Sequence, residues 1–386
     1  MTGIVLSASV RQNLLSLQST AALLATTQND LATGNKVNSA LDNPTDYFTA
    51  QSLNNRASDI SNLLDGIGNG VQVLQAANTG ITSLQSLVAS AQSIANQVLQ
   101  TTAGYSSNST VTSTAALGGT AANLVDGTTI KSGDTLSIAA STGIPAFSFT
   151  FGASDSLAQL NTALAASNLT ASLNSTNQLV ISTTNDADAS TIGAVTYTGS
   201  GSTTFGTVVA PVADAASQTL RANLVSQYNN IISQINATSQ DSSFNGINLL
   251  NGDQLKLTFD ETGKSTLNIS GVTFNATGLG LNTLTVGTDF LDNNSANAVL
   301  TQLGAASDTL RSEASALGSN LSIVQIRQDF NKNLINVLQT GASNLTLADS
   351  NEEAANSQAL STRQSIAVSA LALANQSQQS VLQLLR

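Results

Sequence analysis

The chain contains no cysteine, no histidine and no tryptophan among its 386 residues. Without cysteine it has neither a disulfide framework nor a thiolate metal site. Without histidine it lacks the commonest general base and the commonest metal ligand. We therefore expect a protein that is not an enzyme and that holds no cofactor and no metal ion.

Charge is also sparse, because only 9% of the residues are charged and the net charge is −11. Nucleic-acid binding needs clustered Lys or Arg, and the chain has no such cluster, so we expect no nucleic-acid partner. No run of 18 apolar residues occurs, which predicts no membrane partner. The first residues lack the basic and apolar regions of a secretory signal, so export would need a route without a cleaved signal.

Aromatic residues make up only 4% of the chain, against 41% hydrophobic residues in total. The apolar surface must then come from Leu, Ile, Val and Ala, which suits the seams of packed helices. The length is sufficient for two or three domains.

An apolar stripe with spacings of four and three begins near the N-terminus. It consists of Val10, Leu14, Leu17, Ala21, Leu24, Gln28 and Leu31. This is a heptad pattern with one polar break, and Gly34 is placed to end the helix. The apolar members of the stripe are our candidate subunit-packing residues at this end of the chain.

A longer helical pattern follows a linker over residues 35–43. Asn43 is placed to cap it and Pro44 to occupy its first position. The seam comprises Leu53, Ala57, Ile60, Leu64, Ile67, Val71, Leu74, Ile81, Leu84, Val88, Ala91, Ile94 and Val98. Gly66, Gly68 and Gly70 interrupt it. A phosphate loop is disfavoured because no strand precedes the glycines and no lysine follows, so we favour helix flexing or tight packing.

The C-terminal part repeats the spacing of the N-terminal part. Its seam comprises Leu310, Ala314, Leu317, Leu321, Val324, Gln328, Asn331, Ile335, Leu338, Ala342 and Leu345. Residues 350–353 (SNEE) indicate a capping box that opens a last helix. The candidate subunit-packing residues of that helix are Leu360, Ala367, Ala370, Ala374, Val381 and Leu384.

Such narrow stripes need a partner, because each apolar side chain contributes ~1.5–3 kcal/mol only when it is covered. The stripes could form an internal helical bundle. Alternatively, the two chain ends could pair with each other and with neighbouring copies. The periodicity alone favours neither arrangement.

The middle of the chain has a different composition, rich in Thr, Ser, Gly and Ala over residues 101–216. Alternation at Phe147, Phe149 and Phe151 predicts a half-buried strand, and residues 179–181 predict another. Asp155 is placed to cap a short helix. We interpret this region as an inserted α+β module.

After this module, a helix is expected from Leu220, Leu224, Tyr228, Ile231 and Ile235. Residues 255–259 and 266–269, joined by a turn over 262–264, predict a β-hairpin.

Five motifs in order resemble bacterial flagellins. They are DLATGNKVNSA at residues 30–40, DNPT at 42–45, SFNGINLL at 243–250, TGLGL at 277–281 and ANQSQQSVLQLL at 374–385. They are similar to the family's "LSSGLRINSA", "DDAA", "FNG", "LGL" and closing "ANQxPQxVLxLL" segments. The resemblance covers roughly residues 1–100 and 217–386.

The resemblance implies a fold that is mainly α, with long terminal coiled-coil helices and an antiparallel helical bundle carrying a β-hairpin. The inserted β-rich α+β module would be an outer domain. The expected parts are a core helix and linker (1–43), a rod helix (44–100), the outer domain (101–216), a rod helix and hairpin (217–290), a C-terminal rod helix (291–348) and a C-terminal core helix (349–386).

The resemblance also implies a structural subunit of the flagellar filament, located outside the cell. Flagellins are exported through the flagellar secretion apparatus without a cleaved signal, and their ends fold on assembly. The implied partners are further copies of the chain, sister flagellins, a hook-associated junction protein, a filament cap protein and an export chaperone. In many flagellins the variable region follows the "LGL" segment, whereas here the insert comes earlier.

Three alternatives remain at this point. The hook–filament junction protein shares the terminal helices, although the "FNG", "LGL" and closing motifs favour flagellin. An enzyme would need an acid–base or metal site, and a pair such as Asp186 and Asp188 starts like a calcium loop. That segment lacks the glycine and glutamate of such a loop, so we expect a polar loop. A free-standing secreted adhesin would not need stripes at both ends.

Overall fold

The computed structural model describes residues 8–384, which form two compact units. The first unit contains the chain up to Asn69, the segment Leu257–Leu267 and the chain from Ile323 onward. The second contains Gly70–Lys256 and Asn268–Ser322. Helices α2 (Pro44–Gln100) and α5 (Asn293–Thr346) each contribute residues to both units.

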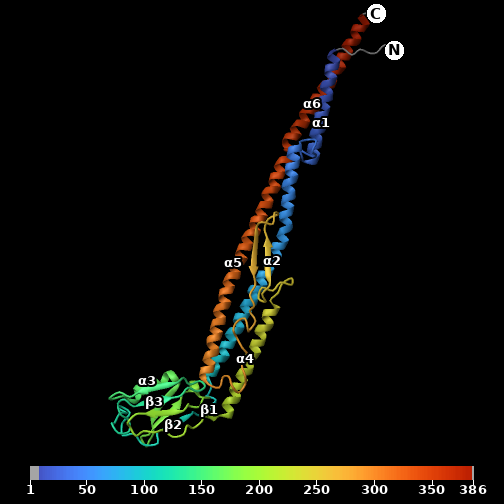
Figure 1. Cartoon of the computed structure of the whole chain (residues 1–386). Helices are drawn as coiled ribbons and strands as arrows, with labels where there is room; N and C mark the ends of the chain where they lie inside the picture. Colours follow the sequence, from blue (N-terminus) through green and yellow to red (C-terminus); the bar gives the residue numbers. More distant parts are fainter. Residues whose placement is uncertain (1–7, 385–386) are drawn as a thin grey trace. The chain divides into compact units, whose positions relative to one another are not determined.

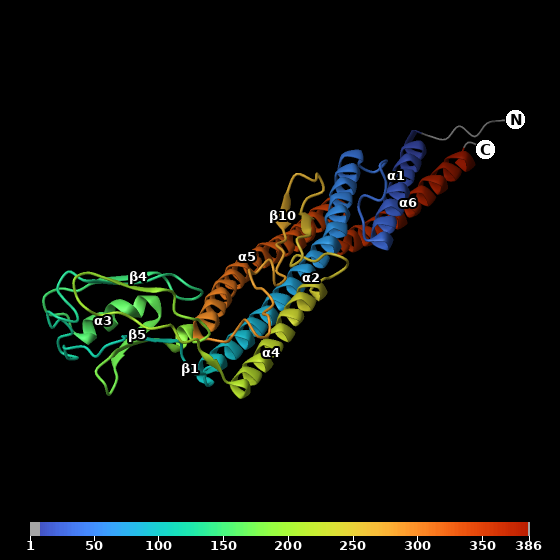
Figure 2. The ribbon, with the colours of Figure 1, turned by 60° about the horizontal axis from the view of Figure 1, so that its bottom comes forward.

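In the first unit, α1 (Ala8–Thr33) and α6 (Ser350–Leu384) lie side by side and run in opposite directions (Figures 1 and 2). Gly34 ends α1 with φ of +72°, as its position in the sequence predicts. Backbone hydrogen bonds join the segments beyond the two helices. Ala348 N donates to Gly34 O at 3.0 Å, and Lys36 N donates to Thr346 O at 2.8 Å.

The starts of α2 and α6 are capped by side chains. Asn43 Oδ1 accepts a hydrogen bond from Asp46 N at 3.2 Å, which confirms the predicted cap of α2. The predicted capping box of α6 is wrong by one residue, because Asp349 Oδ1 accepts from Asn351 N at 2.9 Å. Ser350 is instead the first residue of the helix.

The predicted seams of α2 and α5 are confirmed by burial. In the first unit Ala57, Ile60 and Leu338 form a small core, against which Leu53, Leu334 and Ile335 pack. All members of the predicted α5 seam are buried or half-buried. A Cβ added at Gly66 would meet nothing within 4 Å, so tight packing does not explain this glycine.

Strands β9 (Gln254–Thr258) and β10 (Thr266–Ser270) form the predicted hairpin. Asp260 Oδ1 accepts from Ser265 N at 2.9 Å, and Gly263 supplies the positive φ that the turn requires. Asn331 of α5 donates to Phe259 O at 2.9 Å, so a buried amide holds this turn in the first unit.

In the second unit, α4 (Ala215–Asp241) lies alongside α2 (Figures 1 and 2). Its buried residues are Ser217, Arg221, Leu224, Val225, Tyr228, Ile232, Ile235 and Ser239. One predicted member of its seam is misplaced. Leu220 is exposed and Ile231 is half-buried, because the inward side passes through Arg221 and Ile232.

The chain between α2 and α4 forms small antiparallel sheets of short strands. Two three-stranded sheets have the orders β2-β6-β5 and β4-β3-β7, and β1 pairs with β8. The strands are β1 (Tyr105–Ser107), β2 (Thr110–Thr112), β3 (Thr135–Ile138), β4 (Phe147–Thr150), β5 (Leu169–Leu173), β6 (Leu179–Thr183), β7 (Val195–Thr198) and β8 (Val212–Ala213). The two strands predicted from the sequence correspond to β4 and β6.

A separate hydrophobic core fills this inserted region. Leu136, Ile181 and Phe151 from the strands and their flanks meet Leu160 and Leu164 of helix α3 (Leu157–Leu164). Ser156 caps α3 in a capping box with Gln159, so the predicted cap at Asp155 is wrong by one residue. Short 3-10 turns follow at Ala165–Ser167 and Asn185–Ala187.

Candidate assembly surface

The paired terminal helices contact each other through both apolar and polar residues. On α1, Val10 is buried and Leu17, Ala21 and Leu24 are half-buried. The half-buried positions of α6 recur at spacings of four and three and are Glu353, Ser357, Leu360, Gln364, Ala367, Leu371 and Ala374. One α1–α6 pair therefore leaves its own seam only partly covered.

Three of the predicted packing residues lie away from this seam. Leu14, Leu31 and Ala370 are exposed. The side of α1 that faces inward runs instead through Asn13, Thr20 and Thr27, because one antiparallel neighbour covers only part of the heptad stripe. The side chains of Val381 and Leu384 lie outside the described residues.

The outer sides of both helices carry large apolar side chains that nothing in the described chain covers. Leu15 is 61% exposed and Leu23 is 56% exposed on α1. On α6, Ile366 is 63% exposed, Val368 is exposed and Leu373 is 68% exposed. Large apolar patches on a folded surface mark sites of protein contact. Covering each of these side chains would contribute ~1.5–3 kcal/mol.

A groove of about 480 Å³ lies between α1 and α6. It is lined by Asn13, Ser16, Ser19, Thr20 and Leu23 of α1 and by Leu360, Arg363, Ile366 and Ala367 of α6. Arg363 is the charged residue of this lining. A groove between two helices that is lined by both polar and apolar side chains, with Leu23, Leu360 and Ile366 among the latter, suits a third amphipathic helix.

A second apolar stripe lies on α5 within the first unit. Ile323, Ile326, Phe330 and Val337 are all exposed, at spacings of three, four and seven residues. They lie outside the confirmed inward seam of the same helix. This half of α5 thus has two apolar sides, of which its own unit covers one.

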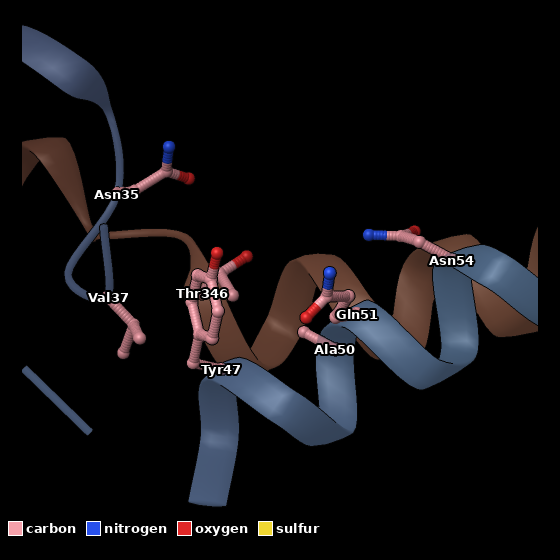
Figure 3. Close-up of a pocket in the computed structure, with 7 residues that line it drawn as sticks. All are labelled: Asn35, Val37, Tyr47, Ala50, Gln51, Asn54 and Thr346. Carbon is pink, nitrogen blue, oxygen red and sulfur yellow. The ribbon is translucent and has the colours of Figure 1, made fainter. Parts of the chain in front are cut away.

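A smaller pocket of about 290 Å³ lies in the first unit between the linker after α1, the start of α2 and the end of α5 (Figure 3). Asn35 and Val37 come from the linker, Tyr47, Ala50, Gln51 and Asn54 from α2, and Thr346 from α5. These residues supply amides, hydroxyls and apolar groups but no carboxylate and no cation. The lining therefore lacks the paired acid and base of a hydrolytic site.

A buried cation lies in the second unit, at the base of the insert. Arg221 is 1% exposed, and its guanidinium donates to three backbone carbonyls. The distances are 3.0 Å to Thr102 O, 2.7 Å to Phe290 O and 3.4 Å to Thr101 O. Arg221 therefore joins α4 to the end of α2 and to the segment before α5.

Two carboxylates act electrostatically on Arg221. Burial lowers the pKa of Arg221, while the negative charges of Asp188 and Asp292 act in the opposite direction. Burial raises the pKa of Asp188, which is fully enclosed. Asp186 is exposed in a short turn, whereas Asp188 of the same segment is buried. Among the described residues, no group of three or more acidic side chains is arranged to hold a metal ion.

Arg221 was missed in the sequence because the helical pattern places apolar residues on the inward side. The sequence offers one indication of a special role for Arg221, which is its isolation from other cations. Lys131 is the only basic residue between Arg56 and Arg221.

Comparison with known families identifies both ends of the chain. Residues 6–142 match the model of the bacterial flagellin N-terminal helical region, and residues 300–385 match that of the C-terminal helical region. The chain belongs to the bacterial flagellin family. This family is structural, and nothing in the matches favours the hook–filament junction protein.

Similar flagellins include those of two bacteria. The chain is 31% identical to flagellin FljJ and 30% identical to flagellin FljK of Caulobacter vibrioides, over 46% and 42% of its own length. These alignments span 66% and 59% of the two relatives. It is 36% identical to flagellin A of Rhizobium meliloti, over 23% of each chain. No helix in residues 8–384 is long and apolar enough to cross a membrane.

Proposed function

We propose that this flagellin is a structural subunit that polymerises into the filament of the bacterial flagellum. The observation that carries the proposal is the exposure of Leu15, Leu23, Ile366 and Leu373 on the outer sides of the α1–α6 pair. Each pair covers its own seam incompletely, so its apolar surface is available to identical neighbours. Polymerisation would bury these residues repeatedly along the filament.

In the proposed filament, the pairs of α1 and α6 form coiled coils in the core. The candidate packing residues of Val10 to Leu31 and of Leu360 to Leu384 lie at contacts within and between subunits. Residues 44–100, 217–290 and 291–348 form the surrounding rod layer. Residues 101–216 form an outer domain, which is supported by their separate hydrophobic core.

The protein would act without catalysis and without a cofactor. Its proposed place is the extracellular filament, reached through the flagellar secretion apparatus. Its main partner is itself. Sister flagellins, a hook-associated junction protein, a cap protein and an export chaperone are proposed further partners, because flagellins share them.

Electron microscopy of the purified full-length chain at neutral pH tests the proposal. We expect filaments after seeding with sheared filament fragments, at concentrations where unseeded chain assembles slowly. A chain that stays monomeric at high concentration with seeds present, and whose α1 and α6 are already folded, would contradict it.

A further inference from the structure

Helix α6 has a second stripe, next to the one that faces α1. It consists of Glu352, Asn356, Ala359, Arg363, Ile366, Ala370 and Leu373, again at spacings of four and three. All seven residues are exposed. The helix therefore presents one heptad stripe to α1 and an adjacent, uncovered stripe to its surroundings.

The charges of the two terminal helices are few and unevenly placed. On α1 they are Arg11 and Asp30, and on α6 they are Glu352, Glu353 and Arg363. The carboxylates lie where α1 ends and α6 begins, and the cations lie further along the pair. A parallel copy shifted along the pair would therefore bring its carboxylates toward the first copy's cations.

The opposite charges of the outer α6 stripe share one side of the helix. Glu352 and Arg363 are eleven residues apart, close to three full turns of an α-helix. At 1.5 Å per residue their separation along the axis is about 16 Å. That distance is too long for the two side chains of one copy to meet.

We infer that Arg363 of one copy pairs with Glu352 of a second, parallel copy that is displaced by about 16 Å along α6, give or take the reach of the two side chains. The inference rests on the proposed polymerisation and names the charge pair that determines its register. Leu23 and Ile366 line the same groove as Arg363, so apolar side chains flank this cation.

The partner of this outer stripe is a second copy of the chain, because the stripe itself carries both charges, with apolar residues between and beyond them. Such a contact is head-to-tail, so each copy offers one cation and one carboxylate and the series has no end. A charge pair of this kind mainly determines register, while the apolar residues supply most of the affinity.

A charge exchange tests the inference on the full-length protein. The variants are Arg363→Glu, Glu352→Arg and the double variant that carries both changes. The measured quantity is the critical concentration for seeded assembly, by sedimentation and electron microscopy. Each single variant should raise it by about tenfold, equivalent to ~1.4 kcal/mol, and the double variant should return to within about threefold of the wild type.

A second double variant, Arg363→Glu with Glu353→Arg, is the matched control. Glu353 lies in the same turn as Glu352 but on the stripe that faces α1, so the control should not restore assembly. Arg363→Lys keeps the charge and should assemble nearly normally. Circular dichroism of the monomers checks that the rest of the chain is folded.

The inference is overturned if the exchange of Arg363 and Glu352 assembles no better than its single variants, or if the control restores assembly equally well. It is also overturned if the single variants assemble like the wild type. A wild-type chain that forms no filaments would instead refute the proposed function itself, and the inference with it.

Discussion

In the inserted region, most leucine and isoleucine side chains are almost completely enclosed, whereas the described ones on α1 and α6 are half-buried or exposed. Leu136, Leu160 and Ile181 belong to a core that short strands and one helix close from all sides. Leu15 and Leu373 lie on α1 and α6, which pack against each other and leave both side chains exposed. The same chemistry therefore stabilises a folded domain in one region and leaves surface for association in the other.

The difference shows that burial depends on how many elements surround a side chain. A strand pairs with neighbours on its edges and is covered on a face, so even strands of four residues can bury alternate side chains. Two paired helices cover only a narrow stripe of each other. The insert buries its apolar side chains within one copy of the chain, whereas the terminal helices need further copies to cover theirs.

Removing either end of the chain should have the largest effect on assembly and should leave the insert intact. Deleting residues 1–35 or 350–386 should abolish polymerisation, because either deletion removes one helix of the pair. The insert should remain folded, since its core lies within residues 111–192. Negative-stain microscopy reports assembly and near-ultraviolet circular dichroism reports the insert. Filaments from either truncated chain, or an unfolded insert, would contradict the comparison.

Arg221→Met should destabilise the second unit by about 3–5 kcal/mol. The change leaves three buried carbonyls without their donor and removes the positive charge that acts on Asp188. Urea denaturation, followed by a probe in this unit, measures the loss. The control is Arg311→Met, at an exposed pair with Asp308 3.1 Å away, which should change stability by less than about 0.5 kcal/mol. Similar effects for the two variants would argue against a structural role for Arg221.

Two matched leucine variants compare the role of a buried leucine in the insert with that of an exposed leucine on α6. Leu160→Ala should cost the insert about 2–5 kcal/mol through a cavity in its core, with little effect on filament formation. Leu373→Ala should leave the melting of the monomer nearly unchanged and raise the critical concentration for assembly. Calorimetry and seeded sedimentation on both variants provide the comparison. The idea fails if both substitutions affect the same property.

Acid should weaken the insert through Asp126, the smallest of the expected effects. Its carboxylate accepts hydrogen bonds from the Thr129 hydroxyl and from Thr128 N, Thr129 N and Ile130 N, which together lower its pKa to about 2 despite the opposing effect of burial. A lowered pKa means that the stabilisation is complete above about pH 4 and is lost as the pH falls toward 2. We expect a contribution of about 1 kcal/mol, since the group is partly exposed.

Thermal melting of the insert between pH 5 and pH 2 measures this contribution. Asp126→Asn should melt earlier at pH 5 and should lose part of the acid dependence. An unchanged slope of melting temperature against pH in the variant would show that Asp126 is not responsible.

The long helices could be predicted because their periodicity extends over many turns. The seams of α2 and α5 were correct because several elements surround these helices, so every apolar position of the stripe finds cover. On α1 the same pattern was a poorer guide, and Leu14 and Leu31 lie outside the contact with α6. A single neighbouring helix covers only one side of a stripe, and the sequence does not indicate which side that is.

The sequence by itself determined the absence of thiol and imidazole chemistry, the long helical stripes, the hairpin turn and the family motifs. These follow from local composition and spacing, which act over a few residues. Only the tertiary structure decided that Arg221 and Asp188 are buried, how the strands of the insert pair, and which apolar residues of α1 and α6 stay exposed. Those properties depend on which distant segments surround a residue, and local spacing contains no information about such neighbours.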